Sequence, residues 1–367
     1  MLDSPRQPLP VRVIVDITPT INALHSLTAV ADAPNSPGIG EWAVETYEKF
    51  SPEEREIIQI LTKWIGTDAL INAIPDGEAR ASFPAYLDEL SAFQATQLRD
   101  VLLKWMSARP SACVNYKPCR KVDNPDTLLA SREAFLTHFV NQEKTEEDTR
   151  IANRVYDLLT DPPALQAFLY EFLRRYWDTY LKDEWSHHLP ELEAAVDAFK
   201  QLDLSGLSHF EVIETITRRN FRGIFRPDAL QDYAVMRFIP SPHCGPYILK
   251  TGDEEELQIS FGAYHLSERT SGVTMMDSTQ MVERLKALGD ETRLEIIRLL
   301  KREGEVGTQE IIDRFKLSKS AASRHMRQLT ANGIVDARVD EDGLSKFYRL
   351  NPAFMPQMQE MLGTLVG

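Results

Sequence analysis

Residues 318–349 combine a short amphipathic helix with an alternating segment that folds back on itself. The helix is predicted from SKSAASRHMRQLTANG, in which Ser318 is a good N-cap and Gly333 a usual C-cap. An apolar stripe at positions i, i+4 and i+7 predicts one buried side, made of Ala322, Met326 and Leu329. The other side carries donors and positive charge, on Lys319, Ser320, Ser323, Arg324 and Arg327. This pattern predicts a surface helix whose basic side is open to a partner.

The segment after this helix is a predicted hairpin with basic positions. IVDARVD and LSKFYRL alternate apolar and polar residues around a turn at 341–343. A helix followed by such a hairpin predicts a winged helix-turn-helix, with the recognition helix at 318–331 and the wing at 335–350. Arginine and lysine suit guanine edges and phosphates, and serine suits phosphates and either base type. We therefore expect the basic side of the helix to contact double-stranded DNA, together with Arg338 and Lys346 on the wing.

The sequence predicts three helices before the recognition helix and one after the wing. The apolar stripe of the first helix consists of Met281, Leu285 and Leu288. Asp290 caps the second helix and Thr308 the third, and the last helix is FMPQMQEMLGTLV. A domain of this size cannot bury both terminal helices alone, so we expect them to pack across a two-fold axis in a homodimer. Two recognition helices about 34 Å apart would then address successive major grooves of a near-palindromic operator.

The distribution of charge favours DNA binding in spite of the net charge of −14. Residues 276–367 hold 14 basic and 14 acidic side chains, whereas residues 1–275 hold 27 basic and 41 acidic ones. Between Lys316 and Arg349 there are seven basic and four acidic residues, a local charge of +3. The expected DNA face is therefore basic, but the acidic remainder would repel DNA and make binding strongly dependent on salt.

The length of 367 residues favours two or more domains. Residues 40–230 carry mostly helical patterns, whereas AVMRFIP, GPYILK and LQISFGAY are short β-rich runs that we expect to form a small sheet with VRVIVDI at 11–17. The polar stretch SERTSGVTMMDST marks a boundary. We expect a mainly α fold with small β elements (α+β). Residues 1–272 would form a mostly helical sensing or dimerisation domain with a small sheet, and residues 277–367 the winged helix-turn-helix domain.

Nothing in the sequence favours a membrane or an oxidising compartment. The start MLDSPRQPLP lacks the apolar region of a signal peptide, and no run of about 18 apolar residues is present. The three cysteines, Cys113, Cys119 and Cys244, are too scattered for a disulfide framework. We expect a cytoplasmic protein that does not bind membranes.

The C-terminal quarter of the chain resembles the ArsR family of bacterial transcriptional repressors. The motifs that carry the resemblance are LKALGDETRLEIIRLL, LSKSAASRHMRQLTANGIV and the wing ending KFYRL, in that order. Glu291 stands where a proline is common in the family. The resemblance implies a homodimeric repressor that leaves its operator when an effector binds, here an unknown small molecule. By position it assigns DNA contact to Lys319, Ser320, Ser323, Arg324 and His325, although His325 could equally be a residue of helix packing.

Many ArsR relatives sense metal through Cys residues on the helix before the turn, or through Asp and His on the last helix. Here these places read GEVGTQEIIDRF and NPAFMPQMQEMLGTL, without Cys or His. Thiolate and imidazole are the ligands that bind transition metals tightly. We therefore expect no metal or other cofactor at these places. Cys113 and Cys119, with the His and Cys residues at 187–188 or 243–244, leave a metal site elsewhere open, although their spacing matches no zinc pattern.

The first 275 residues resemble a long domain of unassigned role that precedes winged helices in some bacterial regulators. The resemblance is carried by TPTINALHSLTAV, the stretch from Trp177 to Trp185, and MRFIPSPHCGPYIL. Two interpretations of the aromatic stretch FLRRYWDTYLKDEWSHH are open. Its aromatic residues could line a pocket for an aromatic or anionic ligand, or they could form the core side of a helix whose charges face water. These residues are Tyr176, Trp177, Tyr180 and Trp185.

An alternative function is an enzyme or small-molecule-binding protein with a fused regulatory winged helix. Such an enzyme requires a convergent cluster of acidic or histidine residues with shifted pKa. The sequence contains no phosphate loop, nucleophile elbow or HExxH motif, so we expect no catalytic residues. The arginines at 218–226 could bind a phosphate or extend the DNA contact, but an ion-paired surface is the simpler interpretation. A winged helix that binds protein is less compatible with the small residues Ser320 and Ala321, which suit close approach to a duplex.

Overall fold

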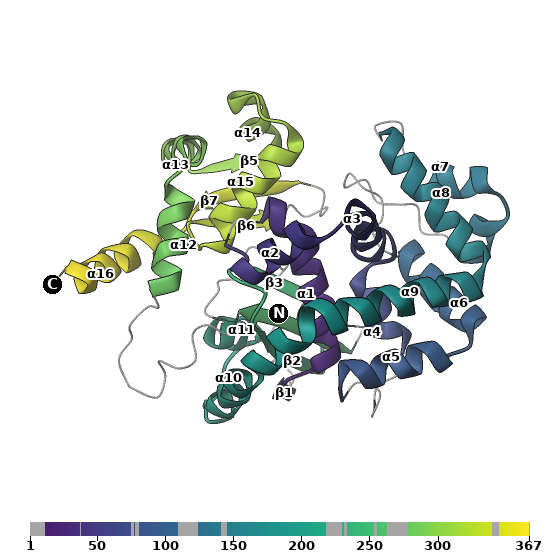
Figure 1. Ribbon diagram of the computed structural model, residues 1–367. Coiled ribbons are helices and arrows are strands. Elements are labelled where there is room, and N and C mark those ends of the chain that lie inside the picture. Colours follow the sequence, from purple (N-terminus) through teal and green to yellow (C-terminus); the bar gives the residue numbers. More distant parts are fainter. Residues whose placement is uncertain are drawn as a thin grey trace, which may run out of the picture. The chain divides into compact units, whose positions relative to one another are not determined.

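The computed structural model describes residues 12–36, 38–74, 77, 81–108, 124–140, 145–217, 230, 233–252, 255–262, 278–339 and 345–366. The chain divides into two compact units (Figure 1). The helical unit comprises Thr18–Pro34 and Glu41–Leu189, and the mixed unit comprises Met1–Ile17, Asn35–Gly40 and Pro190–Gly367. The boundary expected at 272–277 lies outside the described residues, so the division into 1–272 and 277–367 stays a prediction.

The helical unit is built from short helices, several of which begin with a proline and a side-chain cap. Ser51 caps its helix through a capping box with Glu54, and the Asp161 side chain accepts a hydrogen bond from the backbone of Ala164. Proline is tolerated in the first turn because its missing N–H would have no helical partner there. The elements are α1 (Pro19–Asp32), η1 (Ala33–Asn35), α2 (Glu41–Lys49), α3 (Pro52–Gln59), η2 (Ile60–Ile65), α4 (Thr67–Ala73), α5 (Phe83–Ala92), α6 (Ala95–Ala108), η4 (Pro125–Leu129), α7 (Arg132–Phe139), α8 (Glu146–Thr160), α9 (Pro162–Tyr176), η5 (Trp177–Leu181) and the first part of α10 (Lys182–Lys200).

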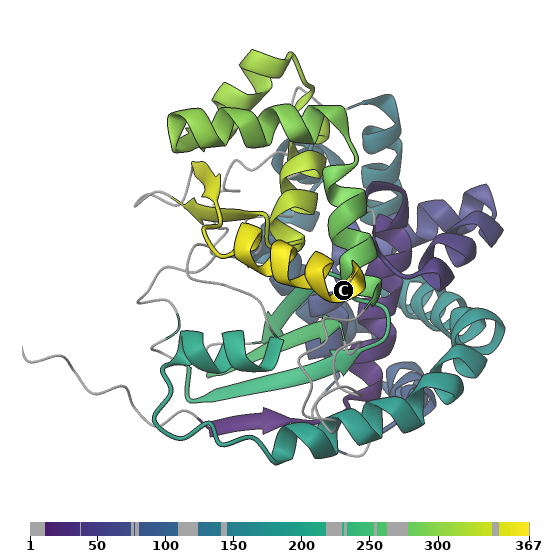
Figure 2. The same cartoon turned by 90° about the vertical axis from the view of Figure 1, so that its left-hand side faces the viewer.

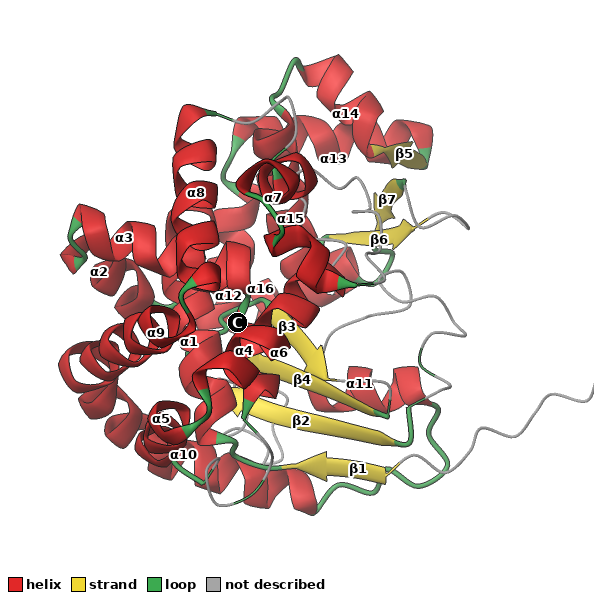
Figure 3. Ribbon diagram, turned by 90° about the vertical axis from the view of Figure 1, so that its right-hand side faces the viewer, coloured by secondary structure: helices red, strands yellow, loops and turns green. Residues whose placement is uncertain are grey.

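A four-stranded sheet forms the first part of the mixed unit (Figure 3). Its strands run in the order β1-β2-β4-β3; β1 and β4 are parallel to β2, and β3 is antiparallel to β4. The predicted recruitment of the strand near residues 11–17 is confirmed, since Arg12 pairs with Val235. The strands are β1 (Arg12–Val15), β2 (Val235–Ser241), β3 (Ile248–Gly252) and β4 (Glu256–Gly262), and α11 (His209–Thr217) precedes β2.

One partly buried ion-pair cluster links three parts of this sheet. The guanidinium of Arg237, on the central strand β2, donates to Glu256 on β4 at 2.7 Å and also pairs with Asp16, which follows β1. A one-residue shift of β1 or β4 against β2 would move the side chains of that strand to the other face of the sheet. The cluster therefore helps to fix the register of β1 and β4 against β2.

The C-terminal part of the mixed unit is a winged helix-turn-helix, as predicted. Its wing strands β6 and β7 form the predicted antiparallel hairpin, and a short strand, β5, that the sequence analysis did not predict pairs with β7. The mainly α fold with small β elements is confirmed. The elements are α12 (Ser278–Leu288), α13 (Glu291–Glu303), β5 (Glu305–Gly307), α14 (Thr308–Phe315), α15 (Lys319–Ala331), β6 (Val335–Val339), β7 (Lys346–Leu350) and α16 (Phe354–Val366).

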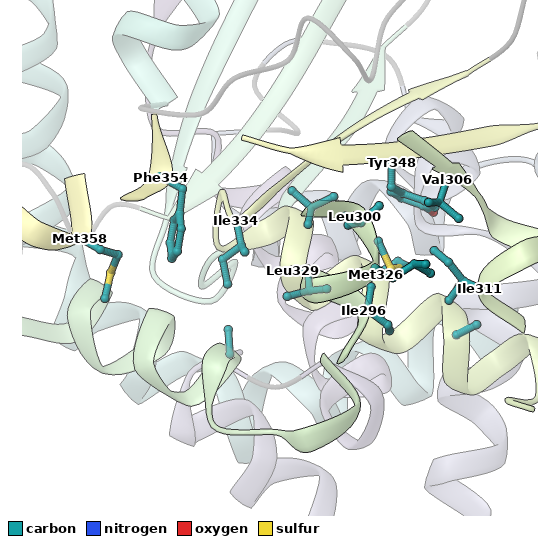
Figure 4. Packing of buried hydrophobic residues seen from close by; sticks show 14 of the residues in the cluster. Ile296, Leu300, Val306, Ile311, Met326, Leu329, Ile334, Tyr348, Phe354 and Met358 are labelled. Carbon is teal, nitrogen blue, oxygen red and sulfur yellow. The ribbon is translucent and has the colours of Figure 1, made fainter. Parts of the chain in front are cut away.

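The winged helix has its own apolar core, drawn in Figure 4. Met326 and Leu329 project from α15 toward Ile296 and Leu300 of α13, while Tyr348 reaches in from β7. Each fully buried side chain of this size contributes about 1.5–3 kcal/mol relative to an exposed one. The apolar stripe predicted for the recognition helix therefore anchors it and leaves its opposite side outside the core.

Candidate nucleic-acid interface

The turn before α15 is held by backbone geometry and one side chain. Lys316, which ends α14, has a left-handed backbone with φ of 50°, and the N–H of Leu317 donates to the carbonyl of Ile312 at 3.1 Å. The hydroxyl of Ser318 then accepts a hydrogen bond from the backbone of Ala321 at 3.1 Å, as an N-cap does. The sequence thus fixes where α15 begins and how sharply the chain turns into it.

The exposed side of α15 is polar and basic. Lys319, Ser320, Arg324 and Arg327 are exposed and Ser323 is half-buried, whereas the predicted apolar stripe on the opposite side is fully buried. We call these five residues the basic face. Residues near the N-terminus of such a helix reach base edges when it lies in a major groove. The structure therefore brings all five residues together in an arrangement that suits a duplex.

His325 is a correction, because the structure places it inside the winged helix. Only 7% of the residue is exposed, and its Nδ1 lies 3.7 Å from a carboxylate oxygen of Asp290, the N-cap of α13. Burial lowers the pKa of His325, an effect that the Asp290 carboxylate opposes. His325 follows Ala322 by three positions and precedes Leu329 by four, so the helical period puts all three on one side. Of the two interpretations left open, helix packing is the one that the structure supports.

The two predicted wing residues are both exposed, but Arg338 is engaged within the sheet. Its Nε donates to Glu305 on β5 at 2.8 Å, and its guanidinium lies 4.6 Å from the ring centroid of Phe347. The hydrogen bond from Arg338 lowers the pKa of Glu305. Lys346 lies at the start of β7, where its carbonyl accepts from Thr308 at 3.2 Å. The tip of the wing at 340–344 lies outside the described residues.

Sequence reasoning missed a contact between the basic face and a distant part of the mixed unit. The guanidinium of Arg327 donates to the hydroxyl of Ser36 at 3.4 Å. Ser36 is buried and belongs to Asn35–Gly40, which we call the connecting segment. In the same segment Gly38 has φ of +84°, and a Cβ there would lie 2.2 Å from the carboxylate of Glu283 on α12. The connecting segment is therefore closely fitted to the winged helix.

The aromatic residues proposed as a ligand pocket are core residues of the helical unit. Tyr176, Trp177 and Trp185 are buried, and Tyr180 is partly buried. The hydroxyl of Tyr176 is hydrogen-bonded to that of Ser26 at 2.8 Å, and burial raises its pKa. The burial and the ring contacts of these residues support the core interpretation of the aromatic stretch, whereas a ligand pocket there stays a prediction.

A surface hollow of about 530 Å³ in the same unit lies between η4 and α7, away from the aromatic stretch. It is lined by Thr127, Leu128, Ser131, Glu133, Ala134, Thr137 and His138.

Other candidate sites receive little support from the residues that the structure describes. Among them, no three His, Cys, Asp or Glu side chains are grouped as metal ligands would be, and no helix is both long and apolar enough to cross a bilayer. Cys244 is buried, and burial raises its pKa to about 12. Cys113, Cys119 and the arginine cluster at 218–226 lie outside the described residues.

The chain matches a family model and known regulators. Residues 288–338 match a model described as a helix-turn-helix domain. The transcriptional activator HlyU of Vibrio cholerae is 34% identical over 89 residues, which are 24% of this chain and 80% of that protein. The arsenic resistance transcriptional regulator ArsR1 of Pseudomonas putida is 36% identical over 81 residues, 22% of this chain and 62% of that protein. The HTH-type transcriptional regulator MJ1325 of Methanocaldococcus jannaschii is 41% identical over 66 residues, 18% of this chain and 72% of that protein.

Among solved structures, HlyU from Vibrio cholerae N16961 matches with 34% identity and a TM-score of 0.20. The match covers 24% of this chain and 94% of the HlyU chain.

Proposed function

Because the chain belongs to the ArsR family of winged helix-turn-helix transcriptional regulators, we propose that it binds operator DNA through the basic face of α15 and the wing. The observation that carries this proposal is the exposure of Lys319, Ser320, Arg324 and Arg327 on one side of a helix anchored by its other side. Arginine and lysine contribute phosphate contacts and guanine contacts, and serine contributes shorter polar contacts. The DNA-binding surface would comprise these residues with Ser323, Arg338 and Lys346.

We further propose that the active form is a homodimer that uses α12 and α16. Large apolar side chains are exposed on both helices: Val282 and Leu285 on α12, and Met355 and Leu362 on α16. Arg284 holds the two helices together, since it donates to Gln357 at 3.4 Å and lies 5.7 Å from the ring centroid of Phe354 (Figure 2, α12 light green, α16 yellow). Exposed apolar side chains on paired helices favour burial against a second copy. The dimer would bind a near-palindromic operator.

The remaining parts of the proposal concern regulation. We propose that the chain is a cytoplasmic repressor that leaves DNA when a small-molecule effector binds, with residues 1–272 as the sensing or dimerisation domain and residues 277–367 as the DNA-binding domain. The curated relatives carry the names of transcriptional regulators, which supports a regulator in preference to an enzyme. HlyU is named as an activator, so a promoter fused to a reporter gene, with and without the protein, must decide between repression and activation.

DNA binding by the full-length protein tests the proposal. A labelled duplex from the promoter of its own gene and a shuffled duplex of the same composition would be titrated at several KCl concentrations, with fluorescence anisotropy as the readout. We expect tighter binding to the promoter duplex and a linear fall of log K with log salt, because phosphate contacts release counterions. Equal affinity for both duplexes at every salt concentration would overturn the proposal of an operator in that promoter. Absence of any salt-sensitive binding would overturn DNA binding by the basic face.

A further inference from the structure

A buried arginine lies behind the recognition helix and joins three elements of the winged helix. Only 8% of Arg293, on α13, is exposed. Its Nε donates to the carbonyl of Ala287 at 2.5 Å, one Nη donates to the carbonyl of Lys286 at 2.8 Å, and the other donates to the side-chain oxygen of Gln328 at 2.6 Å. The planar guanidinium thus contacts the end of α12 and the last turn of α15 from its place on α13.

The surroundings compensate the buried charge of Arg293. Lys286 and Ala287 lie in the last turn of α12, where carbonyl groups have few helical partners and the helix dipole is negative. The carboxylate of Asp290 lies 3.7 Å from the guanidinium. A lysine could not reproduce this arrangement, because its ammonium is a compact charge without the fixed fork of the guanidinium. The geometry therefore requires arginine at this position.

Gln328 connects this arginine to the basic face. It is 2% exposed, and its backbone carbonyl accepts from the side chain of Asn332 at 3.0 Å. Arg324 precedes Gln328 by one helical turn and Arg327 is its direct neighbour. A rotation of α15 about its axis would break the bond between Arg293 and Gln328 and would move both exposed arginines. The bond therefore opposes that rotation.

We propose that Arg293 is a positioning residue for DNA recognition, which fixes the rotation of α15 through Gln328 so that the basic face meets base edges in register. The proposal rests on the DNA contact proposed above for that face. Supporting hydrogen bonds behind a binding surface hold its side chains within a fraction of an ångström of productive geometry. Base contacts depend on that geometry, whereas phosphate contacts tolerate small shifts. Loss of Arg293 should therefore reduce sequence discrimination more than it reduces general affinity for DNA.

The test compares the full-length protein with Arg293→Lys, and with Gln328→Met as a second variant that removes the acceptor and keeps a similar volume. Arg298→Lys is the matched control, because Arg298 is an exposed residue on the same helix that pairs with Glu295. The probes are a duplex selected by the wild-type protein from a random pool and a shuffled duplex of the same composition. Dissociation constants are measured for both across a KCl series, and urea unfolding reports how much of each variant is folded.

We expect Arg293→Lys and Gln328→Met to weaken binding to the selected duplex about 10-fold or more, a loss typical of one wrong base pair. Affinity for the shuffled duplex and the slope of log K against log salt should stay unchanged, and Arg298→Lys should behave like the wild type. The inference is overturned by unchanged discrimination in both folded variants, or by equal losses on the two duplexes. A wild-type protein that selects no sequence from the pool would instead contradict the proposed function itself.

Discussion

Arg338 on β6 and Glu305 on β5 form an ion pair across the wing sheet, with Nε 2.8 Å from the carboxylate. The strand between them, β7, contributes Phe347, whose ring lies under the guanidinium. A residue expected to contact phosphate is thus held by an acidic residue of the same small sheet. If the wing binds DNA as proposed, Glu305 competes with the DNA phosphates for the guanidinium of Arg338.

Replacement of Glu305 should strengthen DNA binding. In Glu305→Gln the amide keeps the size of the carboxylate but no longer holds Arg338 by charge, so the guanidinium can turn to a phosphate. We expect tighter binding at low salt and a slope of log K against log salt that is steeper by up to about one. The measurement is anisotropy over a KCl series. Glu295→Gln, with the same change in net charge on α13, is the control, and an equal gain there would show that only net charge matters.

Removal of Arg324 should weaken binding to the operator. This side chain is exposed near the middle of the basic face. We expect Arg324→Ala to lose about 1–3 kcal/mol of binding free energy if the guanidinium contacts a base, with relaxed specificity at one position of the site. Binding to single-base variants of the duplex gives both quantities. Arg298→Ala serves as the control, and an unchanged affinity of Arg324→Ala would remove this residue from the DNA-binding surface.

A charge on the exposed apolar side of α16 should break the proposed homodimer. Met355 is 59% exposed, more than Val282, Leu285 or Leu362. We expect Met355→Glu to shift the protein to a monomer, since an unpaired carboxylate would be buried at the two-fold interface. Light scattering after size exclusion gives the mass directly. Val44→Glu changes an exposed apolar residue of α2 in the helical unit and should leave the mass unchanged. A Met355→Glu variant that stays dimeric would place the interface elsewhere.

Acid should destabilise the protein in part through His25 on α1. Complete burial lowers the pKa of His25 from 6.5 to about 4. Below pH 6.5 the His25 side chain therefore takes up a proton in the unfolded chain but stays neutral in the folded chain. The free energy of unfolding consequently decreases as the pH falls from 6.5 toward 4. The full effect is about 3 kcal/mol in the free energy of unfolding.

Urea unfolding at pH 7 and pH 5, followed by circular dichroism, measures this loss. The difference between the two pH values should shrink in His25→Gln, because the group that takes up the proton on unfolding is gone. His187→Gln, at an exposed position of α10, should keep the wild-type difference. An unchanged difference in His25→Gln would assign the acid sensitivity to other groups.

The winged helix was predictable from sequence because its signals are local. Caps, an apolar stripe and an alternating hairpin each lie within a few residues, and the structure confirms them. The burial of His325 could also have been predicted, since it shares the stripe of Ala322 and Leu329. Arg293 carried a similar signal, because it lies three positions before the buried Ile296 and seven before the buried Leu300. A charged residue on a buried stripe requires internal partners.

Other features depended on contacts that no local pattern carries. β5 has three residues, which is too few for a strand period to be visible. The aromatic stretch around Trp177 fits a core and a pocket equally well until its neighbours, such as Phe83 at 5.6 Å between ring centroids, are known. The contact between Arg327 and Ser36 joins residues 291 positions apart. Such pairings are set by the tertiary fold and leave no trace in the spacing of either segment.

The hydrogen bond from Arg327 to Ser36 has a consequence for affinity. The connecting segment that contains Ser36 joins α1 to α2, so the helical unit is tethered by covalent chain to a group that contacts the basic face. If a phosphate of bound DNA draws Arg327 away from Ser36, DNA binding weakens the contact between the connecting segment and Arg327. By linkage, that contact weakens DNA binding by the same factor. A molecule that stabilised the contact of this segment with Arg327 would then lower the affinity for DNA, without itself binding to the recognition helix.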